Sequence, residues 1–413
     1  ANVAAFVGHS ALRTYVMGEA ASERAATDEE VLRMKEIVLE AMQAGAVGFS
    51  TSTSPAHNGE GGLPMPSRLA DEGELRALVG CLKEAGRGVF MLTKGGHTSM
   101  PFLESLAALS GQPIVVAALL HSSTNPQAVF EDLEAIAQAN ARGRRLVGAV
   151  SCCPLAMDFT LRSPYTFEGL ESWRPALPLK GEEFKKKLKD VSFRQTIRVE
   201  LSRPAHFRLF NGEWDKVVVV ESLRKDFEQR SVAELARSSG KDPLDAMLDL
   251  ALEEDLGTVF SALLLNSDEA AVARLLQHPA AMVSLSDAGA HLTFFNDAGF
   301  GLHLLGHWVR ELGVLDLAQA AWRLAGQPAQ VFGIRGRGAL KPGWHADLLL
   351  FDPARVGRGA RRRVFDLPAG QPRLTTSAIG VHGVWVNGVR IADAQGMRAA
   401  QRLPGRLLRD FAA

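Results

Sequence analysis

The feature that most constrains the fold is a regular alternation of short apolar runs with longer amphipathic stretches. The apolar runs are 2–8, 46–51, 88–94, 113–121, 145–151 and 280–286. They are apolar at consecutive positions, which indicates strands buried on both faces, as in parallel sheets covered by helices. Strands that alternate with helices in this way predict an α/β fold.

The stretch after the first run carries the signals of a helix start and a helix end. Thr27 is an expected N-cap because Glu30 follows it at the spacing of a capping box. Gly45 is expected to end the helix, since glycine readily adopts the left-handed conformation that closes a helix. The segment between them is therefore predicted to be an amphipathic helix.

The alternation of strands and helices favours a (β/α)8 barrel of the TIM type, but the number of strands is too small for a complete one. Such a barrel needs eight parallel strands, whereas the strong apolar runs number six. A further run, 214–223, is either a seventh barrel strand or part of an insertion. We therefore expect a barrel that is incomplete in this chain and lacks its first strands.

Two changes in residue composition along the chain suggest the domain organisation. Residues 154–215 carry several prolines, many aromatic residues and a Lys-rich helix, and they are expected to form an insertion that acts as a lid over the barrel. After about residue 335 the chain turns to short strands with Gly and Asn-Gly turns, which predict part of a small β-sandwich. The expected division is a barrel over 1–335, with the insertion, and a sandwich portion over 336–413.

The charge balance and the cysteines narrow the classes of function and location. Lys plus Arg and Asp plus Glu are 46 each, so no net field draws the chain to nucleic acid or to an anionic membrane. No window approaches the roughly 20 apolar residues of a membrane span. The odd number of cysteines, with Cys152 and Cys153 adjacent, and an opening segment without signal-peptide features predict a cytoplasmic protein.

Two polar residues at strand ends are the leading candidates for a catalytic or a metal-binding role. Asp287 follows the last apolar run, at the rim of the barrel where catalytic groups collect, and its alternative role is a helix N-cap. His121 ends the run 113–121, and a neutral imidazole at such a place is a common metal ligand. Its alternative role is a hydrogen-bonded histidine of the core.

Four further residues are candidate substrate-binding groups. His9, Ser10 and Arg13 follow the first apolar run, and an arginine at a barrel mouth can bind a substrate carboxylate through paired hydrogen bonds. His291 lies one helical turn beyond Asp287 and could orient it or contact substrate. Surface or capping roles are the alternatives for Ser10 and Arg13.

Other motifs indicate structure more than function. His303 and His307 are four residues apart, but Leu304 stands where the metalloprotease pattern needs Glu, so core or interface roles are expected. Cys152 and Cys153 are expected to be buried, inert thiols. The sequence has no Gly-x-Ser-x-Gly elbow, which excludes a serine hydrolase of the α/β-hydrolase type.

Several longer segments resemble the amidohydrolase superfamily, in its D-aminoacylase or N-acyl-D-amino-acid deacylase-like branch. They are "NVAAFVGHSALRTYVMG", "AGAVGFSTS", "SDAGAH", "AAWRLAGQPAQVFGIRGRGALKPGWHADLLLFDP", "FDLPAGQPRLTTSAIGVHGVWVNG" and "VHGVWVNGVRIAD". The resemblance implies a metal-dependent (β/α)8 barrel with a small β-sandwich, which hydrolyses an amide with a metal-bound water. It implies that Asp287 takes the proton of that water and passes it to the leaving amine.

The resemblance also suggests ligands for the metal. His121 falls where the family places a histidine, although the family has two adjacent histidines and this chain has His121-Ser122. Some amidohydrolases bridge two metals with a carboxylated lysine, for which Lys94 is the candidate; a lysine extending to solvent is the alternative. Asp287 would be a further ligand of the metal. The expected cofactor is one or two ions of zinc, or else of iron or manganese.

Two family motifs are absent from the sequence. No His-x-His pair and no Gly-Asn-Cys-Gly turn occur in it. Both belong to the first two strands of the family's barrel, which are also the strands that the count of apolar runs does not find. These strands are therefore expected to be a separate chain, a cleaved piece or a part that was lost. In the first case a second chain would carry them, complete the site and form an oligomer with this one.

Three functions remain open at this point. The leading hypothesis is hydrolysis of an amide bond in an N-acyl amino acid or a related small molecule. A related alternative is an enzyme for cyclic amides or imides. The alternative from another class is a non-catalytic barrel subunit that binds a ligand or supports a partner.

Overall fold

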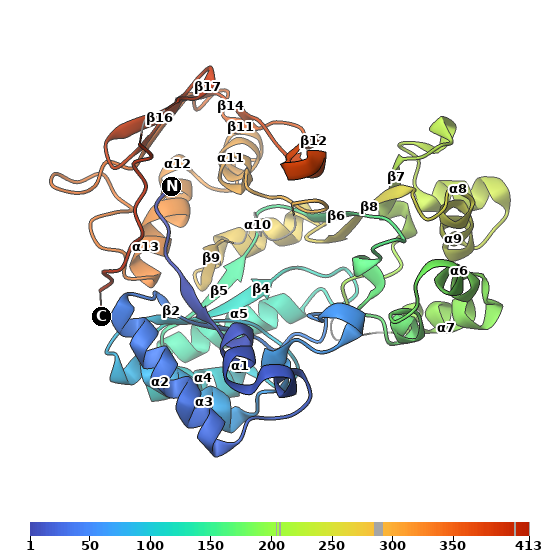
Figure 1. The fold of residues 1–413 in the computed structure, drawn as a ribbon. Coiled ribbons are helices and arrows are strands. Elements are labelled where there is room, and N and C mark those ends of the chain that lie inside the picture. Colours follow the sequence, from blue (N-terminus) through green and yellow to red (C-terminus); the bar gives the residue numbers. More distant parts are fainter. Residues whose placement is uncertain (204, 206–207, 285–291, 400–401, 413) are drawn as a thin grey trace.

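A six-stranded parallel sheet forms the centre of the molecule (Figure 1). The computed structural model describes residues 1–203, 205, 208–284, 292–399 and 402–412. The strands follow one another in the order β1 (Phe6–Gly8), β2 (Gly48–Ser52), β3 (Val89–Thr93), β4 (Ile114–Leu119), β5 (Leu146–Val150) and β9 (Ala281–Val283). Each of the six apolar runs overlaps one of them, so these predicted strands are confirmed.

Helices cover the outer face of this sheet. They are α1 (His9–Met17), α2 (Asp28–Ala44), α3 (Glu72–Glu84), α4 (Met100–Ser110), α5 (Ala128–Ala141) and α10 (Glu269–Gln277). The predicted capping box and glycine end of α2 are confirmed: Thr27 accepts a hydrogen bond from the Glu30 amide, and Gly45 is left-handed at φ 104°. Strand and helix alternation of this kind is that of an α/β barrel of the TIM type.

Apolar side chains pack on both faces of the sheet, as the consecutive apolar positions predict. Phe49 and Phe90 stack at 5.8 Å on the outer face, within the core shared with the helices. Val115, Ala149 and Met282 form a smaller cluster on the inner face. Burial on both faces is what a barrel strand requires, because one face meets helices and the other meets the barrel interior.

A separate lobe is inserted after β5 and has its own core (Figure 1). Its antiparallel sheet has the order β6 (Leu155–Phe159), β8 (Val259–Leu265), β7 (Val217–Glu221). Its helices are α6 (Gly181–Lys189), α7 (Val191–Leu201), α8 (Val232–Ser239) and α9 (Pro243–Glu253). The apolar run 214–223 therefore belongs to the insertion, whose core extends past residue 215 because β8 pairs with both β6 and β7.

The chain then returns along the barrel and ends in short strands. The helices α11 (Phe300–His303), α12 (Leu317–Ala321) and α13 (Gln327–Val331) are extended by π-helical turns at Leu304–Glu311 and Trp322–Gly326. The strands β10 (Leu348–Phe351), β15 (Val381–Val386), β16 (Val389–Asp393) and β17 (Gly396–Met397) form one antiparallel sheet. The predicted Asn-Gly hairpin joins β15 to β16, with Asn387 at φ 49° and Gly388 at φ 82°.

Two strand pairs connect this C-terminal part to the rest. They are β11 (Gly357–Arg358) with β14 (Ala378–Ile379), and β12 (Arg362–Leu367) with β13 (Gln371–Thr375). Arg361 and Arg363, at the start of the second pair, donate to the two carboxylate oxygens of the buried Asp158 in the insertion lobe. Among the described residues, no helix has the length and apolar character needed to cross a membrane.

Candidate functional site

Asn266 joins the carboxyl ends of the parallel strands to the insertion lobe. Its side-chain oxygen accepts from the His121 amide at 2.7 Å, and its own amide donates to the His121 carbonyl at 2.9 Å. Its side-chain nitrogen donates to the carbonyls of Ser151 and Cys153. Because Asn266 follows β8 while His121 and Ser151 follow β4 and β5, one buried amide fixes three strand ends.

His121 presents a nitrogen without a hydrogen-bond partner. The residue is 4% exposed, and its Nδ1 atom is buried with no partner in the described structure. Burial lowers the pKa of His121 below that of a free imidazole, so the ring is neutral at pH 7. A neutral ring with an unengaged nitrogen has the form that binds a metal ion. The role of His121 as a metal ligand stays a prediction.

Lys94 is engaged in an ion pair. Its ammonium donates to both carboxylate oxygens of Asp132, on α5, at 2.5 and 2.6 Å. Both side chains are about one-fifth exposed. Its role as a carboxylated, metal-bridging lysine stays a prediction.

His9 and Arg13 meet at a buried carboxylate, that of Glu74 on α3. The His9 Nε2 atom lies 2.7 Å from Glu74, its Nδ1 atom lies 2.8 Å from the Thr51 hydroxyl, and Arg13 donates to the second oxygen of Glu74. Burial lowers the pKa of His9. Burial alone would raise the pKa of Glu74, but its hydrogen bonds to His9 and Arg13 outweigh that effect and lower the pKa.

This network fixes α1 against α3. Arg13 also donates to the Arg24 carbonyl at 2.7 Å, so its guanidinium is engaged in hydrogen bonds within the protein. Ser10 donates to the Ser67 hydroxyl at 3.0 Å, beside the network. Substrate binding by His9, Ser10 and Arg13 stays a prediction, and Glu74 is the partner that sequence reasoning did not find.

The donors of a metal site are only partly among the described residues. Asp287 and His291 lie outside them. Within the described part of the chain, no group of three or more His, Cys, Asp or Glu could hold a metal ion. Catalytic zinc sites use about three protein ligands, and of the predicted ligands that are described, only His121 offers an unengaged atom. The described residues therefore do not form a metal site by themselves.

The two adjacent cysteines at the end of β5 are buried in a network with Arg358. Cys152 donates to the Phe300 carbonyl at 3.3 Å. Arg358 donates to the Cys153 sulfur at 3.4 Å and to Asp297 at 2.8 Å. The hydrogen bond between the two thiols, together with burial, raises the pKa of Cys152, so this group stays a neutral thiol.

The histidine pair on the helix beyond this network stacks at 4.9 Å between ring centroids. His307 lies 2.7 Å from Glu269 and 3.0 Å from Glu311, so its ring is engaged with carboxylates. His303 is more enclosed, and burial, with the charge of Arg358, lowers its pKa to about 4. These contacts agree with the structural role expected for both residues.

We expect acid to destabilise the fold through His303. The ordinary pKa of 6.5 falls to about 4 in the folded state, so the folded protein binds fewer protons than the unfolded chain between these values. Stability is therefore lost as the pH falls through that window. His303→Gln should flatten the fall in Tm between pH 7 and pH 5, whereas His382→Gln, at an exposed site on β15, should not. An unchanged slope in His303→Gln would contradict the assignment.

The sequence is similar to a known protein family and to several known enzymes. Residues 215–392 match the model of the Amidohydrolase family. A D-aminoacylase from Alcaligenes xylosoxydans xylosoxydans is 28% identical over 400 residues, covering 95% of this chain and 68% of the relative. An N-acyl-D-aspartate deacylase from the same organism is also 28% identical, covering 98% of this chain and 68% of the relative.

A solved structure agrees with these matches. The crystal structure of N-acyl-D-glutamate deacylase from Bordetella bronchiseptica, complexed with zinc and a phosphonate inhibitor, superposes with a TM-score of 0.62. It is 25% identical, and the match covers 99% of this chain and 72% of that one. The parallel sheet and these matches make the chain similar to the amidohydrolases, which hydrolyse amide carbon–nitrogen bonds. The relatives named here lie in the D-aminoacylase-like branch of that family.

Proposed function

We propose that this protein hydrolyses the amide bond of an N-acyl amino acid or a related small molecule, with a metal ion and with Asp287 as proton acceptor and donor. The observation that carries the proposal is His121, a neutral, buried imidazole with a free nitrogen at a strand end. The relatives named D-aminoacylase and N-acyl-D-aspartate deacylase support the choice of substrate class. The zinc in the N-acyl-D-glutamate deacylase structure supports the choice of metal.

The roles divide between the metal and the chain's own residues. A zinc ion, when bound, supplies a Lewis acid for the scissile carbonyl. Asp287 accepts the proton of the attacking water and returns it to the leaving nitrogen, a task that needs a carboxylate within hydrogen-bond reach. Asn266 keeps the backbone of His121 in place, so that the imidazole keeps one orientation.

Removal of metal is expected to abolish hydrolysis. Dialysis of the purified protein against a chelator should lower both bound zinc and turnover, and added zinc should restore both. His121→Asn should lower the zinc content measured by elemental analysis, whereas His382→Asn, at an exposed position, should not. Full activity in protein shown to be free of metal would contradict the proposal.

The substrate class is tested with a panel that separates the two enzymatic alternatives. N-acetyl and longer N-acyl derivatives of D- and L-amino acids are compared with hydantoins and other cyclic amides by kcat/KM. Faster turnover of the open-chain N-acyl substrates supports the proposal. Preference for the cyclic compounds would assign the alternative of a cyclic amide hydrolase, and binding without turnover by metal-loaded protein would assign the non-catalytic one.

We also propose that a second polypeptide completes the barrel. Among the described residues, β1 pairs only with β2 and β9 only with β5, so one edge of each is open to a further strand. Leu350, Val389 and Met397 are large apolar side chains exposed on the C-terminal strands, a surface of the kind that partners cover. Native and denaturing mass spectrometry of the purified protein tests this, since a single species in both would contradict it.

The location proposed with this function is the cytoplasm. The three cysteines are free thiols and all are buried. Free thiols are typical of reducing compartments.

A further inference from the structure

The segment 292–297 follows the candidate catalytic Asp287 in the sequence and is bonded to the hairpin of β12 and β13. The Leu374 amide, on β13, donates to the Leu292 carbonyl at 2.7 Å. The Asn296 side chain, which is buried, donates to the Leu374 carbonyl at 2.7 Å. Both backbone polar groups of one hairpin residue therefore engage this segment, which fixes it against the hairpin.

The insertion lobe makes a second set of contacts with the same segment. The Asp158 amide, on β6, donates to the Phe294 carbonyl at 2.9 Å. The Phe294 ring lies 5.5 Å from the Tyr165 ring, between centroids, and Phe295 is buried in the core of the lobe. Because withdrawing a buried aromatic side chain from a core costs several kcal/mol, the segment and the lobe are held together as one unit.

Arg363, on β12, joins the hairpin, the lobe and the segment through one guanidinium group. It donates to the Asp158 carboxylate at 2.9 Å, to Glu221 on β7 at 3.1 Å and to the Thr293 carbonyl at 2.9 Å. Asp158 is 5% exposed, and its other carboxylate oxygen accepts from Arg361 at 2.7 Å. Charge-assisted hydrogen bonds of this kind are short and directional, so Asp158, Arg361 and Arg363 form a clamp on the segment.

Fixed points thus lie on both sides of Asp287 in the sequence. Before it, the Ser284 amide, just after β9, donates to the Val150 carbonyl at 3.0 Å. After it, the clamp holds Thr293, six residues further along the chain. A general acid–base group must lie within hydrogen-bond reach of the proton that it transfers, and a misplacement of about 1 Å can cost roughly 100-fold in rate.

We propose that Asp158 and Arg363 are positioning residues of the reaction, through which the insertion lobe and the hairpin hold the chain that carries Asp287. The lobe then contributes to the rate as a support for this chain. The inference rests on the proposed function, since it needs Asp287 to be the proton acceptor and donor. It goes beyond that function because it assigns part of the rate to two side chains that the proposed mechanism does not use.

Substitution of the clamp tests the inference in the zinc-loaded protein with an N-acyl amino acid as substrate. Arg363→Gln removes the charge and should lower kcat roughly 10- to 100-fold, while KM changes less than about threefold. Asp158→Asn keeps the shape of the side chain and should lower kcat in the same way. Arg363→Lys keeps a positive charge and should recover part of the rate.

A double variant shows whether the effect passes through Asp287. In the Asp287→Asn protein, Arg363→Gln should lower the residual rate no further, because a positioning residue has nothing to position once the proton acceptor is absent. An equal fold-loss in both backgrounds would show that Arg363 acts by another route, and the inference would be wrong.

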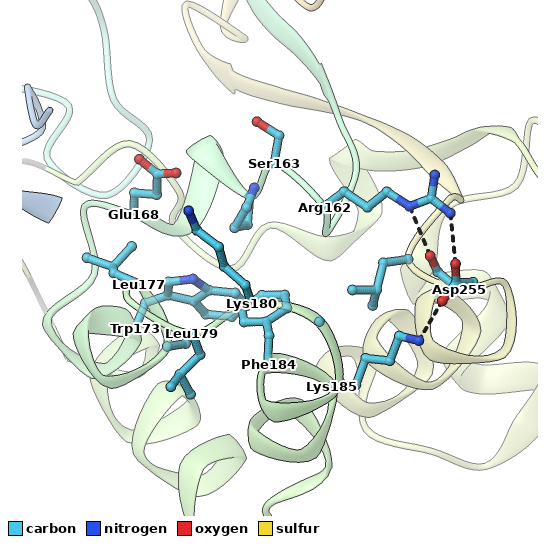
Figure 2. A pocket seen from close by; sticks show the side chains of 14 residues that line it. Arg162, Ser163, Glu168, Trp173, Leu177, Leu179, Lys180, Phe184, Lys185 and Asp255 are labelled. Atoms are coloured by element: carbon cyan, nitrogen blue, oxygen red, sulfur yellow. Dashed lines mark hydrogen bonds and ion pairs between the residues drawn. The ribbon is translucent and has the colours of Figure 1, made fainter. Parts of the chain in front are cut away.

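One matched control lies in the hairpin and one in the lobe. Arg373, on β13, pairs with Asp366 at 2.6 Å within the hairpin. Arg162 pairs with Asp255 at 3.1 Å beside a cavity of about 520 Å³ in the lobe (Figure 2), and none of the residues that line this cavity belongs to the clamp. Arg373→Gln and Arg162→Gln each remove an ion pair outside the clamp and should keep the wild-type kcat.

Hydrogen exchange followed by mass spectrometry reports on the clamp without an assay of activity. Arg363→Gln should speed exchange in the peptides that contain the Asp158 and Leu374 amides, which donate to the segment, whereas the two control variants should not. The inference requires both a lower kcat and faster exchange in Arg363→Gln, and the failure of either overturns it.

The outcomes separate this inference from the proposed function. Loss of rate in Asp287→Asn together with a wild-type rate in Arg363→Gln would overturn the positioning role alone and leave the hydrolytic proposal intact. A wild-type rate in Asp287→Asn would overturn the role of Asp287 and the inference with it. Circular dichroism checks that each variant is folded, and Asp158→Asn and Arg363→Lys carry the test if Arg363→Gln is not.

Discussion

Replacement of Glu74 by alanine is expected to lower the free energy of unfolding by about 3–5 kcal/mol, the usual cost of removing one partner of a buried ion pair. Glu74 is 3% exposed and holds both His9 and Arg13, which are themselves buried. Its loss leaves a guanidinium charge in the core with only carbonyl partners. Urea unfolding followed by circular dichroism measures the change.

A control exists two residues away on the same helix. Glu72 is exposed and lies 3.9 Å from Arg76, so Glu72→Ala should change the stability by less than about 0.5 kcal/mol. The double variant Glu74→Leu with Arg13→Met removes the buried charges together and should recover part of the loss. A Glu74→Ala protein as stable as Glu72→Ala would show that the network contributes nothing to the fold.

The parts of the fold that sequence predicts are those set by local or repeated patterns. Six barrel strands are recognisable because burial on both faces requires consecutive apolar residues, and that pattern stands in the sequence itself. The cap at Thr27 and the turn at Asn387 are recognisable because each depends on two or three neighbouring residues. Such features can be predicted without knowing which distant segments of the chain contact them.

The parts that sequence did not predict depend on distant partners. β8 pairs with β6, about a hundred residues earlier, and its apolar residues carry no signal that separates an insertion strand from a barrel strand. Glu74 lies 61 and 65 residues from Arg13 and His9, so no spacing reveals the network. His121 was found because a strand end marks it, whereas Asn266, which fixes it, follows a strand that the apolar pattern did not identify.

Conversion of Asp287 to asparagine is expected to lower kcat by about 10²–10⁴-fold, the usual contribution of a general acid–base group. Asparagine keeps the size of the side chain but can neither accept nor return a proton, so the loss should lie in kcat more than in KM. Asp287 lies outside the described residues, and its role rests on its place after β9 and on the family resemblance. The assay is made with an N-acyl amino acid at saturating zinc, so that a change in metal affinity does not hide the change in proton transfer.

The pH profile distinguishes a proton-transfer role from a structural one. In the wild type, kcat should fall at acid pH as the carboxylate of the general base becomes protonated, and the residual activity of Asp287→Asn should lack that limb. Asp410→Asn, at an exposed carboxylate near the end of the chain, should keep both the rate and the limb. Asp287→Asn with a rate within about threefold of the wild type would remove Asp287 from the mechanism, because a lost general base cannot cost so little. The proton would then have to pass through another group, and the strand end after β9 would no longer be the place to look for it.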